Sequence, residues 1–227
     1  MWKFLILIIT YTTFSCYGFG QNAIVHYSVV NMNESNVERI KMLKEEVELM
    51  VFTLKYDLEY SSFIKEKYIP KDKFMSKIAP IIIGAPSNFF QFSGTSKSFF
   101  TTSIGNTNYN VDHSFKMKDW QLTTETSIIE KYTCYKAILT EYNNRTETFF
   151  ETIAWFTPDI PAGYGPIGYG GLPGLILQLE FKKSVFTANK ILLNPEKFKN
   201  EVIPDGAQIS VQEYVKLMRA SRKVTED

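Results

Sequence analysis

The chain has 227 residues, and its 25 Lys and Arg residues against 24 Asp and Glu residues give a formal net charge of +1 at pH 7. This balance excludes the basic excess that binding to nucleic acid requires, so we expect no nucleic-acid partner. Aromatic residues make up 15% of the sequence, which suits a single domain with a core of β-strands.

The first twenty residues predict a secretory signal peptide. Lys3 supplies a positive start, residues 4–9 (FLILII) form an apolar core, and residues 18–20 (GFG) form a small-x-small cleavage pattern. Processing as a lipoprotein at Cys16 is a second interpretation, although the residues before Cys16 fit a lipid-attachment sequence poorly. The apolar run is shorter than the about 20 residues that span a bilayer. We therefore expect residues 21–227 to form one exported, monomeric domain without a transmembrane span, in the periplasm or associated with the outer membrane.

The next part of the chain predicts a strand, a helix and a second strand. Residues 23–30 (AIVHYSVV) are rich in β-branched and aromatic side chains, which favour a strand. Ser35 and Glu38 have the spacing of a capping box, and apolar residues then recur every three or four positions through residues 36–50. We expect this amphipathic helix to cover one face of a sheet. Alternation of apolar and polar residues from Phe52 to Tyr60 predicts a strand with one solvated face.

Most of the remaining sequence predicts β-structure. Residues 69–88 leave two alternatives, a short helix interrupted at Pro80 or a covering loop. The sequence then indicates a hairpin at 88–104 and further strands at 115–123, 128–139, 146–157, 175–181 and 184–193. It also indicates a helix at 211–221 that starts with a Ser210–Glu213 capping box. We predict an α+β, mainly β fold, in which a curved, half-barrel-like antiparallel sheet carries an N-terminal covering helix and a C-terminal helix.

Residues 158–174 are unusually rich in Pro and Gly. Four prolines interrupt any strand here, and six of the chain's 12 glycines permit close backbone approach. We interpret the segment as a pinned connection that leads into Leu175–Phe181, a central strand buried on both faces in its first half. A phosphate-binding loop is the alternative, but the pattern fits neither common glycine motif and precedes a strand, not a helix.

The end of this connection resembles a known family. Residues 171–176 read GLPGLI, and they comprise Gly171, Leu172, Pro173, Gly174, Leu175 and Ile176. Further matching segments are 119–122 (DWQL), 132–137 (YTCYKA), 154–161 (AWFTPDIP) and 165–166 (GP). Over residues 117–192 the chain resembles the GLPGLI family of exported bacteroidete proteins. The resemblance implies a cell-envelope location and a β-rich fold, and it transfers no catalytic residue.

Residues that could carry chemistry are few. His26 and His113 are far apart in the sequence and form no ligand-spaced pair, so we expect no metal and no cofactor. After signal removal Cys134 is the remaining cysteine, which excludes an internal disulfide. Its strand-like surroundings favour a small buried apolar residue, and a nucleophile paired with His113 is the alternative.

The most promising side chains lie on and beside the pinned connection. Trp155, Asp159, Tyr164 and Tyr169 are candidate ligand contacts, because loops held by a rigid scaffold often carry function and Tyr offers an apolar body with a polar tip. The alternative is that these aromatics pack the connection onto its own sheet. We expect a non-enzymatic protein that binds an apolar, peptidic or protein ligand. The alternative function is an envelope hydrolase that uses Asp159 or Cys134.

Overall fold

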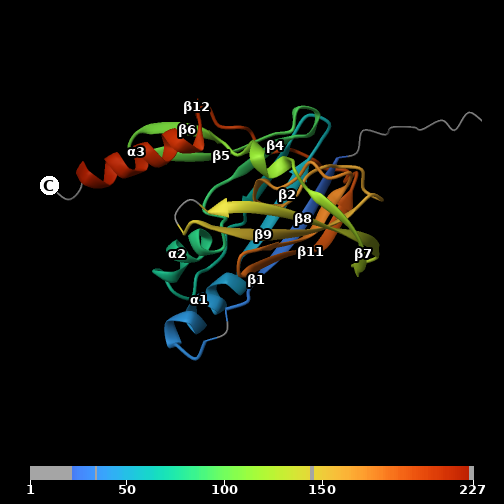
Figure 1. Cartoon of the computed structure of the whole chain (residues 1–227), viewed down its shortest axis with the longest axis horizontal. Coiled ribbons are helices and arrows are strands. Elements are labelled where there is room, and N and C mark those ends of the chain that lie inside the picture. Colours follow the sequence, from blue (N-terminus) through green and yellow to red (C-terminus); the bar gives the residue numbers. More distant parts are fainter. Residues whose placement is uncertain (1–21, 34, 144–145, 225–227) are drawn as a thin grey trace, which may run out of the picture.

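The structure is a computed structural model, and it describes residues 22–33, 35–143 and 146–224. The expectations for the signal peptide and for Cys16 lie outside the described residues. Within them, twelve strands form one sheet in the order β12-β6-β5-β4-β3-β2-β1-β11-β10-β9-β8-β7 (Figure 1). The first and last strands of this order do not pair, so the sheet is not closed.

The strands are β1 Ala23–Asn31, β2 Val51–Tyr56, β3 Ser61–Lys65, β4 Phe89–Phe92, β5 Lys97–Ile104, β6 Thr107–Asp112, β7 Gln121–Ile129, β8 Tyr132–Asn143, β9 Thr148–Thr157, β10 Leu175–Phe181, β11 Ser184–Leu193 and β12 Ala207–Ile209. The α-helices of the described residues are α1 Glu38–Glu48, α2 Met75–Ile82 and α3 Val211–Val224. Short 3₁₀ turns lie at Ser93–Thr95, Ser114–Met117 and Pro166–Gly168. The protein is therefore mainly β.

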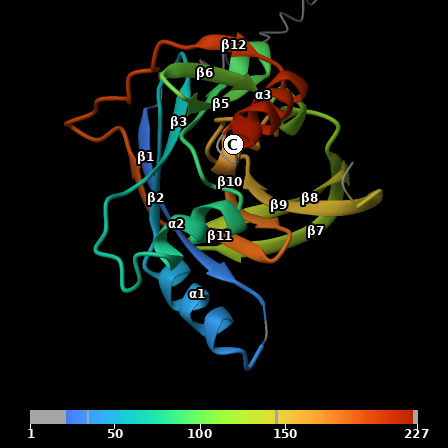
Figure 2. The ribbon, with the colours of Figure 1, turned by 90° about the vertical axis from the view of Figure 1, so that its left-hand side faces the viewer.

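Neighbouring strands are antiparallel, except that β12 runs parallel to β6. β1 lies between β2 and β11, and it joins the half of the sheet that leads to β6 and β12 with the half that leads to β7. Figure 2 shows that the sheet curves, with β1, β2 and β3 on one side and β7, β8 and β9 on the other. β1, near the start of the chain, pairs with β11, near its end. The fold therefore depends on contacts between residues far apart in the sequence.

The Gly- and Pro-rich connection, residues 158–174, is buried inside the curve of the sheet. Tyr164 packs on Tyr56 with ring centroids 5.4 Å apart, and the Gln91 side chain donates a hydrogen bond to the Tyr169 carbonyl at 2.8 Å. The Tyr27 hydroxyl donates to the Ile176 carbonyl at 2.6 Å where the connection enters β10. The connection therefore supplies much of the core. Its backbone is satisfied partly by side chains such as Gln91 and partly by backbone groups, as where the Gly171 N–H donates to the Gly163 carbonyl at 2.8 Å.

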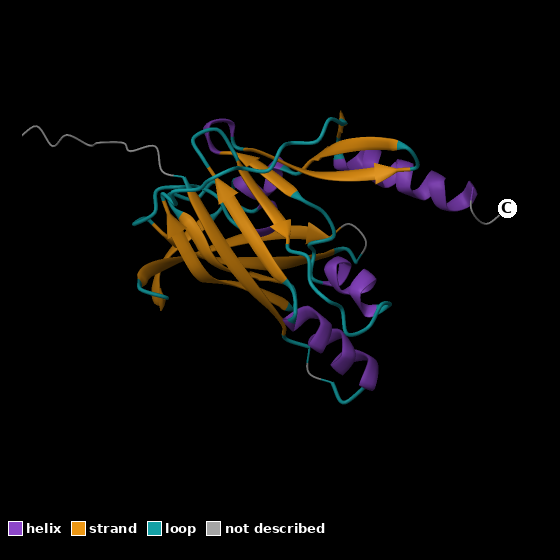
Figure 3. Ribbon diagram, turned by 180° about the vertical axis from the view of Figure 1, so that it is seen from behind, coloured by secondary structure: helices purple, strands orange, loops and turns teal. Residues whose placement is uncertain are grey.

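The expectation of an N-terminal helix that covers the sheet is wrong. α1 lies beside α2 at one end of the sheet, where it packs near β1 (Figures 2 and 3). Its buried side chains are Leu43, Glu46 and Val47, a stripe too narrow to cover a sheet face. The concave face is filled by the connection instead. The corrected fold is an open, mostly antiparallel sheet of twelve strands with three short helices in the described part of the chain.

The first capping box is also wrong, whereas the second is confirmed. The Ser35 hydroxyl accepts a hydrogen bond from the Val37 N–H at 3.2 Å, and α1 begins without a side-chain cap. At α3 the Ser210 N–H and hydroxyl both donate to the Glu213 carboxylate at 2.8 Å, and the Glu213 N–H donates to the Ser210 hydroxyl at 3.2 Å. The reciprocal bonds are those of a capping box.

Three local expectations change. The alternating run from Val51 is two strands, because Asp57 accepts the N–H groups of Glu59 and Tyr60 and turns the chain between β2 and β3. Residues 69–88 contain the short helix α2, and Pro80 lies inside this helix and does not interrupt it. Residues 115–117 belong to a 3₁₀ turn, not to a strand.

The expected central strand is confirmed. β10 lies between β9 and β11, its first three residues are buried, and Gln178 and Glu180 are half-buried. Among the described residues, the helices are all too short or too polar to cross a membrane.

Candidate ligand-binding groove

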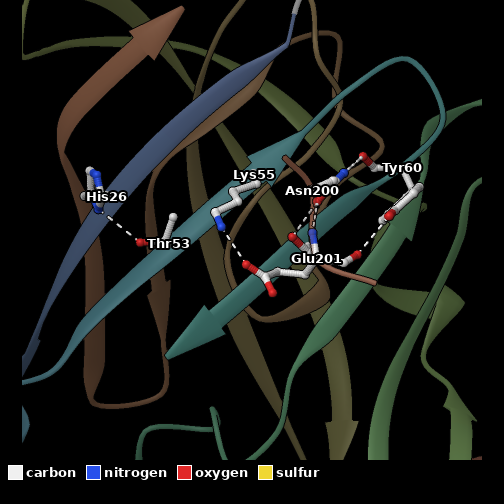
Figure 4. Close-up of polar contacts among 7 residues, drawn as sticks. His26, Thr53, Lys55, Tyr60, Asn200 and Glu201 are labelled. Atoms are coloured by element: carbon white, nitrogen blue, oxygen red, sulfur yellow. Dashed lines mark hydrogen bonds and ion pairs between the residues drawn. The ribbon is translucent and has the colours of Figure 1, made fainter. Parts of the chain in front are cut away.

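Residues 195–206 form a strap that leaves β11, crosses the outer side of β2 and β3, and leads into β12. Figure 4 shows how its middle is held. The Asn200 amide donates to the Asp57 carboxylate at 3.0 Å and to the Tyr60 carbonyl at 3.1 Å, and it accepts from the Ser62 hydroxyl at 2.7 Å. Each of these is a specific, directional contact, so the strap has a fixed path.

Glu201, the next residue of the strap, adds two contacts. Its carboxylate pairs with the Lys55 ammonium of β2, and its carbonyl accepts from the Tyr60 hydroxyl at 2.8 Å (Figure 4). Farther along, the Asn110 amide of β6 donates to the Pro204 carbonyl at 3.3 Å. The strap is therefore fastened to β2, β3 and β6.

His26 also lies on this side of the sheet. It shares a hydrogen bond of 3.0 Å with the Thr53 hydroxyl on the neighbouring strand (Figure 4). In the described part of the chain, no three His, Cys, Asp or Glu side chains gather as metal ligands would. His26 thus has a structural partner in Thr53.

An aromatic cluster lies next to the strap. Tyr60 is 5.9 Å from Phe92 between ring centroids, Phe92 is 6.0 Å from Phe99, and Phe99 is 5.5 Å from Phe90. These side chains come from the turn before β3 and from β4 and β5. Phe90 is buried, whereas Phe92 and Phe99 are half-buried.

A groove of about 680 Å³ lies between Phe92 and Phe99 of this cluster and Ile203 of the strap, and we call it the strap groove. Its apolar lining is Phe92, Phe99, Ile203 and Ile209, and its polar lining is Thr95, Lys97, Ser98, Asn110, Asp112, Ser114, Gln208, Ser210 and Glu213. A smaller cavity of about 340 Å³ lies along the strap at Lys55 and Asn200. The volume of the strap groove is within the range of ligand sites, and its lining is more polar than that of a typical small-molecule site.

The rim of the strap groove carries both signs of charge. Lys97 supplies the cation, and Asp112 and Glu213 supply carboxylates. Hydrogen bonds from the Ser210 backbone and hydroxyl lower the pKa of Glu213, so this carboxylate is ionised at neutral pH. Asp112 accepts the Ser114 N–H at 2.9 Å, which holds its carboxylate in one position. The groove therefore presents two held carboxylates and one lysine beside aromatic side chains.

A second polar cluster is enclosed in the core, around Lys116. The Lys116 ammonium donates to the Ile167 carbonyl at 3.1 Å and lies 4.2 Å from the centre of the Tyr169 ring. Burial lowers the pKa of Lys116 to about 7, against the opposing influence of Glu141. The Tyr169 hydroxyl in turn donates to the Glu141 carboxylate at 2.6 Å.

This core cluster fixes the shape of the connection. Ile167 has φ 45° and ψ 36°, an unfavourable left-handed conformation for a β-branched residue. Its carbonyl is the one that Lys116 holds. Lys116 was expected on a strand, but its ammonium stabilises a strained turn. We therefore assign a structural role to the cluster.

The four residues expected to contact a ligand are split between two environments. Tyr164 and Tyr169 are buried in the core, whereas Trp155 is half-buried on β9, with its indole N–H donating to Glu180 at 3.3 Å. Asp159 is exposed just after β9. The structure brings Tyr164 and Tyr169 into one interior segment and does not gather all four, and neither of the two cavities described above is lined by them.

Cys134 and His113 also lie in different surroundings. Cys134 is buried on β8, and burial raises the pKa of its thiol to about 11. His113 packs against Phe100 and Phe115 at 5.2 and 4.8 Å, and burial lowers its pKa to about 2. The thiol is therefore protonated at neutral pH and the imidazole is neutral, which leaves neither group activated by the other.

Sequence reasoning missed the strap groove because its walls come from β4, β5, β6, the strap, β12 and the start of α3. Two signals were present: the aromatic FFQF and SFF segments of the hairpin, and the Ser210–Glu213 capping box. Neither signal indicates that the two segments meet. That contact depends on the parallel pairing of β12 with β6.

Comparison with known proteins found a family model that matches a short part of the chain. The model of the family described as "Protein of unknown function (Porph_ging)" matches residues 141–178, from the end of β8 through the connection into β10. The match includes residues 171–176, the GLPGLI segment. The comparison with curated proteins gave no match.

Two similar solved structures are titled "Structure of PNGF-II in P21 space group" and "Structure of PNGF-II in C2 space group". They are each 14% identical to this chain over 89% of its length, with TM-scores of 0.58 and 0.56. The chain spans about a third of the length of those chains, since the alignments cover 34% and 33% of them. At this identity the likeness shows the fold alone.

Proposed function

We propose that this is a non-enzymatic cell-envelope protein that binds a peptide segment in the strap groove. The observation that carries the proposal is the groove itself, with Phe92 and Phe99, the cation of Lys97 and the hydrogen-bonded carboxylates of Asp112 and Glu213. The resemblance to the exported GLPGLI family and the signal-like first residues support the envelope location. The match of residues 141–178 to a family of unknown function is compatible with this resemblance.

A peptide fits the groove better than a purely apolar ligand does. An alkyl chain would remove water from Lys97, Asp112 and Glu213 without offering a partner to any of them, which is unfavourable. A peptide offers amide donors and acceptors to Gln208 and to these charges, and an apolar side chain to Phe92 and Phe99. The combination of aromatic side chains and both signs of charge therefore favours a peptide.

The groove carboxylates suit recognition more than catalysis. A general acid at neutral pH needs a carboxyl pKa raised toward 7, whereas hydrogen bonds lower the pKa of Glu213. Outside the groove, the raised pKa of Cys134 removes the thiolate that an attacking nucleophile requires. These two observations support a binding function over the hydrolase alternative.

A displayed library of random linear peptides tests the proposal. Selection on the chain from Gln21 to Asp227 should enrich sequences that combine an aromatic or aliphatic residue with a charged one. Binding of the enriched peptides, measured by fluorescence polarisation, should weaken about tenfold in the Lys97→Glu variant because the cation that lines the groove is replaced by an anion.

The control is Lys190→Glu, which reverses an exposed charge on β11, outside the groove. It should bind the enriched peptides as the parent chain does. Failure to enrich any sequence, or equal weakening by both variants, would contradict the assignment of the strap groove as the binding site.

A further inference from the structure

Helix α2 carries an exposed apolar face at one end of the molecule. Ile81 is 65% exposed, Phe74 54% and Ile82 43%, and Ile78 is half-buried between them. Positions 74, 78, 81 and 82 lie on one side of a helix because of its 3.6-residue period. Soluble proteins rarely leave such a face uncovered without an interaction to explain it.

The opposite face of α2 is firmly packed. Met75, Ala79 and Ile83 are buried, and Gly84 lies directly against the Phe181 ring. Asp72 accepts the N–H groups of Phe74 and Met75 at 2.9 and 2.7 Å, which fixes the start of the helix. The packed face therefore fixes the orientation of α2, with its apolar face toward the solvent. Figure 3 shows α2 beside α1, away from α3 and the β5–β6 hairpin.

The connection that precedes α2 adds one more exposed apolar side chain to this face. Ile69 is 91% exposed in the segment that joins β3 to α2. The segment is anchored from below, because the buried Glu46 of α1 accepts from the Tyr68 hydroxyl at 2.8 Å and from the N–H groups of Lys71 and Asp72 at 3.1 and 3.0 Å. Ile69 is thus presented on a fixed loop.

Lysines surround this face. Lys67, Lys73 and Lys77 are exposed, and none of them pairs with an acidic residue in the described part of the chain. Among the acids of these segments, Glu45 pairs with Lys71 at 3.3 Å, Asp72 accepts the N–H groups at the start of α2, and Glu46 is buried. Glu48 and Glu66 are exposed, but residues 65–77 contain five lysines against two acids. The surroundings of the face are therefore basic.

We infer that the α2 face, defined by Ile69, Phe74, Ile78, Ile81 and Ile82, docks onto the surface of an anionic lipid bilayer. Apolar side chains that protrude from a lysine-rich surface match the interface between acyl chains and anionic headgroups. Protein interfaces are instead depleted in Lys and enriched in Tyr, Trp and Arg. The composition of this face therefore favours a lipid surface over a protein partner. The inference involves none of the residues of the strap groove.

Vesicle flotation of the chain from Gln21 to Asp227, which contains every described residue of the fold, tests the inference. The chain should float with vesicles of phosphatidylcholine mixed with phosphatidylglycerol, and much less with phosphatidylcholine alone. The double variant Ile81→Ser with Ile82→Ser should lower the partition coefficient about tenfold or more. Lys73→Glu with Lys77→Glu should abolish the preference for phosphatidylglycerol.

The matched control is Leu58→Ser, in the turn at the far end of β2 from α1. Leu58 is 78% exposed but lies between Asp57 and Glu59, so its loss should leave flotation unchanged. Unchanged thermal unfolding should show that each variant is folded, since the substituted side chains are exposed.

Three outcomes would overturn the inference: no flotation with either vesicle type, flotation that survives the double Ile substitution, or equal loss in the Leu58 control. Sedimentation of the parent chain as a dimer that the double Ile variant dissociates would also overturn it, because the occupant of the face would then be a second copy.

Discussion

At the scale of single residues, the Gly- and Pro-rich connection is constrained by close backbone approach. Gly171 has φ +77°, and a Cβ at this position would collide with the Met117 carbonyl oxygen. A Cβ on Gly174 would collide with the Thr157 carbonyl oxygen. These glycines are needed because the backbone of another segment, the 3₁₀ turn at Met117 or the end of β9 at Thr157, occupies the space of a side chain.

Gly171→Ala should therefore destabilise the protein by about 3 kcal/mol or more, because it combines an unfavourable φ with a backbone collision. Chemical denaturation monitored by tryptophan fluorescence provides the measurement. Gly94→Ala is the control, because a Cβ there meets nothing within 4 Å, and its effect should stay within about 0.5 kcal/mol. Similar losses for both variants would refute the steric explanation.

At the scale of elements, one of the two predicted capping boxes forms in the structure and the other does not. Ser35 and Ser210 have the same spacing to a following Glu, yet only Ser210 caps its helix. α1 begins at Glu38, two residues later than a box with Ser35 at the cap would require, since Val37 stands at the cap position. A capping motif is thus a local preference that the surrounding chain can override.

Ser210→Ala should lower the hydrogen-exchange protection of the α3 amides about fivefold, because a lost helix cap costs about 1 kcal/mol. Ser35→Ala should leave the protection of the α1 amides unchanged. Loss of protection in α1 after the Ser35 substitution would show that Ser35 caps this helix in solution.

The strap is a second element whose position depends on a few polar contacts. Asn200→Ala removes three hydrogen bonds to β2–β3 residues, and each contributes about 0.5–1.5 kcal/mol. Trypsin should therefore cleave the strap after Lys197 or Lys199 about tenfold faster in this variant.

Glu196→Ala, at an exposed neighbouring position, should leave the cleavage rate unchanged. Mass spectrometry of the first cleavage products gives both the site and the rate. Cleavage of the Asn200 variant at the parent rate would mean that the strap is held by its β12 pairing and not by these contacts.

At the scale of the whole molecule, stability should depend on pH through its enclosed basic groups. Burial holds the folded-state pKa of Lys116 at about 7, below the 10.5 of an unfolded chain. Between these values the unfolded state binds more protons, so the free energy of unfolding rises with pH. The same reasoning applies to His113 between about 2 and 6.5, where stability falls as the pH is lowered.

We expect a slope of up to about 1.4 kcal/mol per pH unit between pH 7 and 9.5, measured by urea denaturation. Lys116→Met should flatten this slope, whereas Lys190→Met, at an exposed position on β11, should retain it. Measurements stop below pH 10 because burial raises the pKa of Tyr27 and Tyr169, and stability falls once unfolded tyrosines ionise. A flat profile for the parent chain would mean that Lys116 is solvated.

Sequence patterns predicted elements better than their arrangement. The strands β1, β10 and β11 and the helix α3 follow from residue type, alternation and capping, which act between neighbours along the chain. The role of α1 was wrong because an apolar stripe shows that a helix packs on something, and does not show on what. The division of residues 51–68 into two strands depended on Asp57, whose turn contacts were not recognised.

The candidate site was the least predictable part. Tyr164 and Tyr169 were recognised as important, but their burial depends on side chains such as Tyr56 and Glu141 that come from distant strands. The strap groove joins Phe99 to Glu213, which are more than a hundred positions apart in the sequence. No local pattern specifies such a meeting.

The amino-acid sequence by itself determined that the chain forms β-strands, that its Gly- and Pro-rich connection leads into a buried strand, and that its charges are balanced. Only the tertiary structure decided that this connection fills the curve of the sheet, that the strap closes a groove against β4–β6, and that the apolar face of α2 remains uncovered. The physical reason is range: backbone preference and periodicity act within a few residues, whereas strand register and core filling are set by contacts between distant parts of the chain.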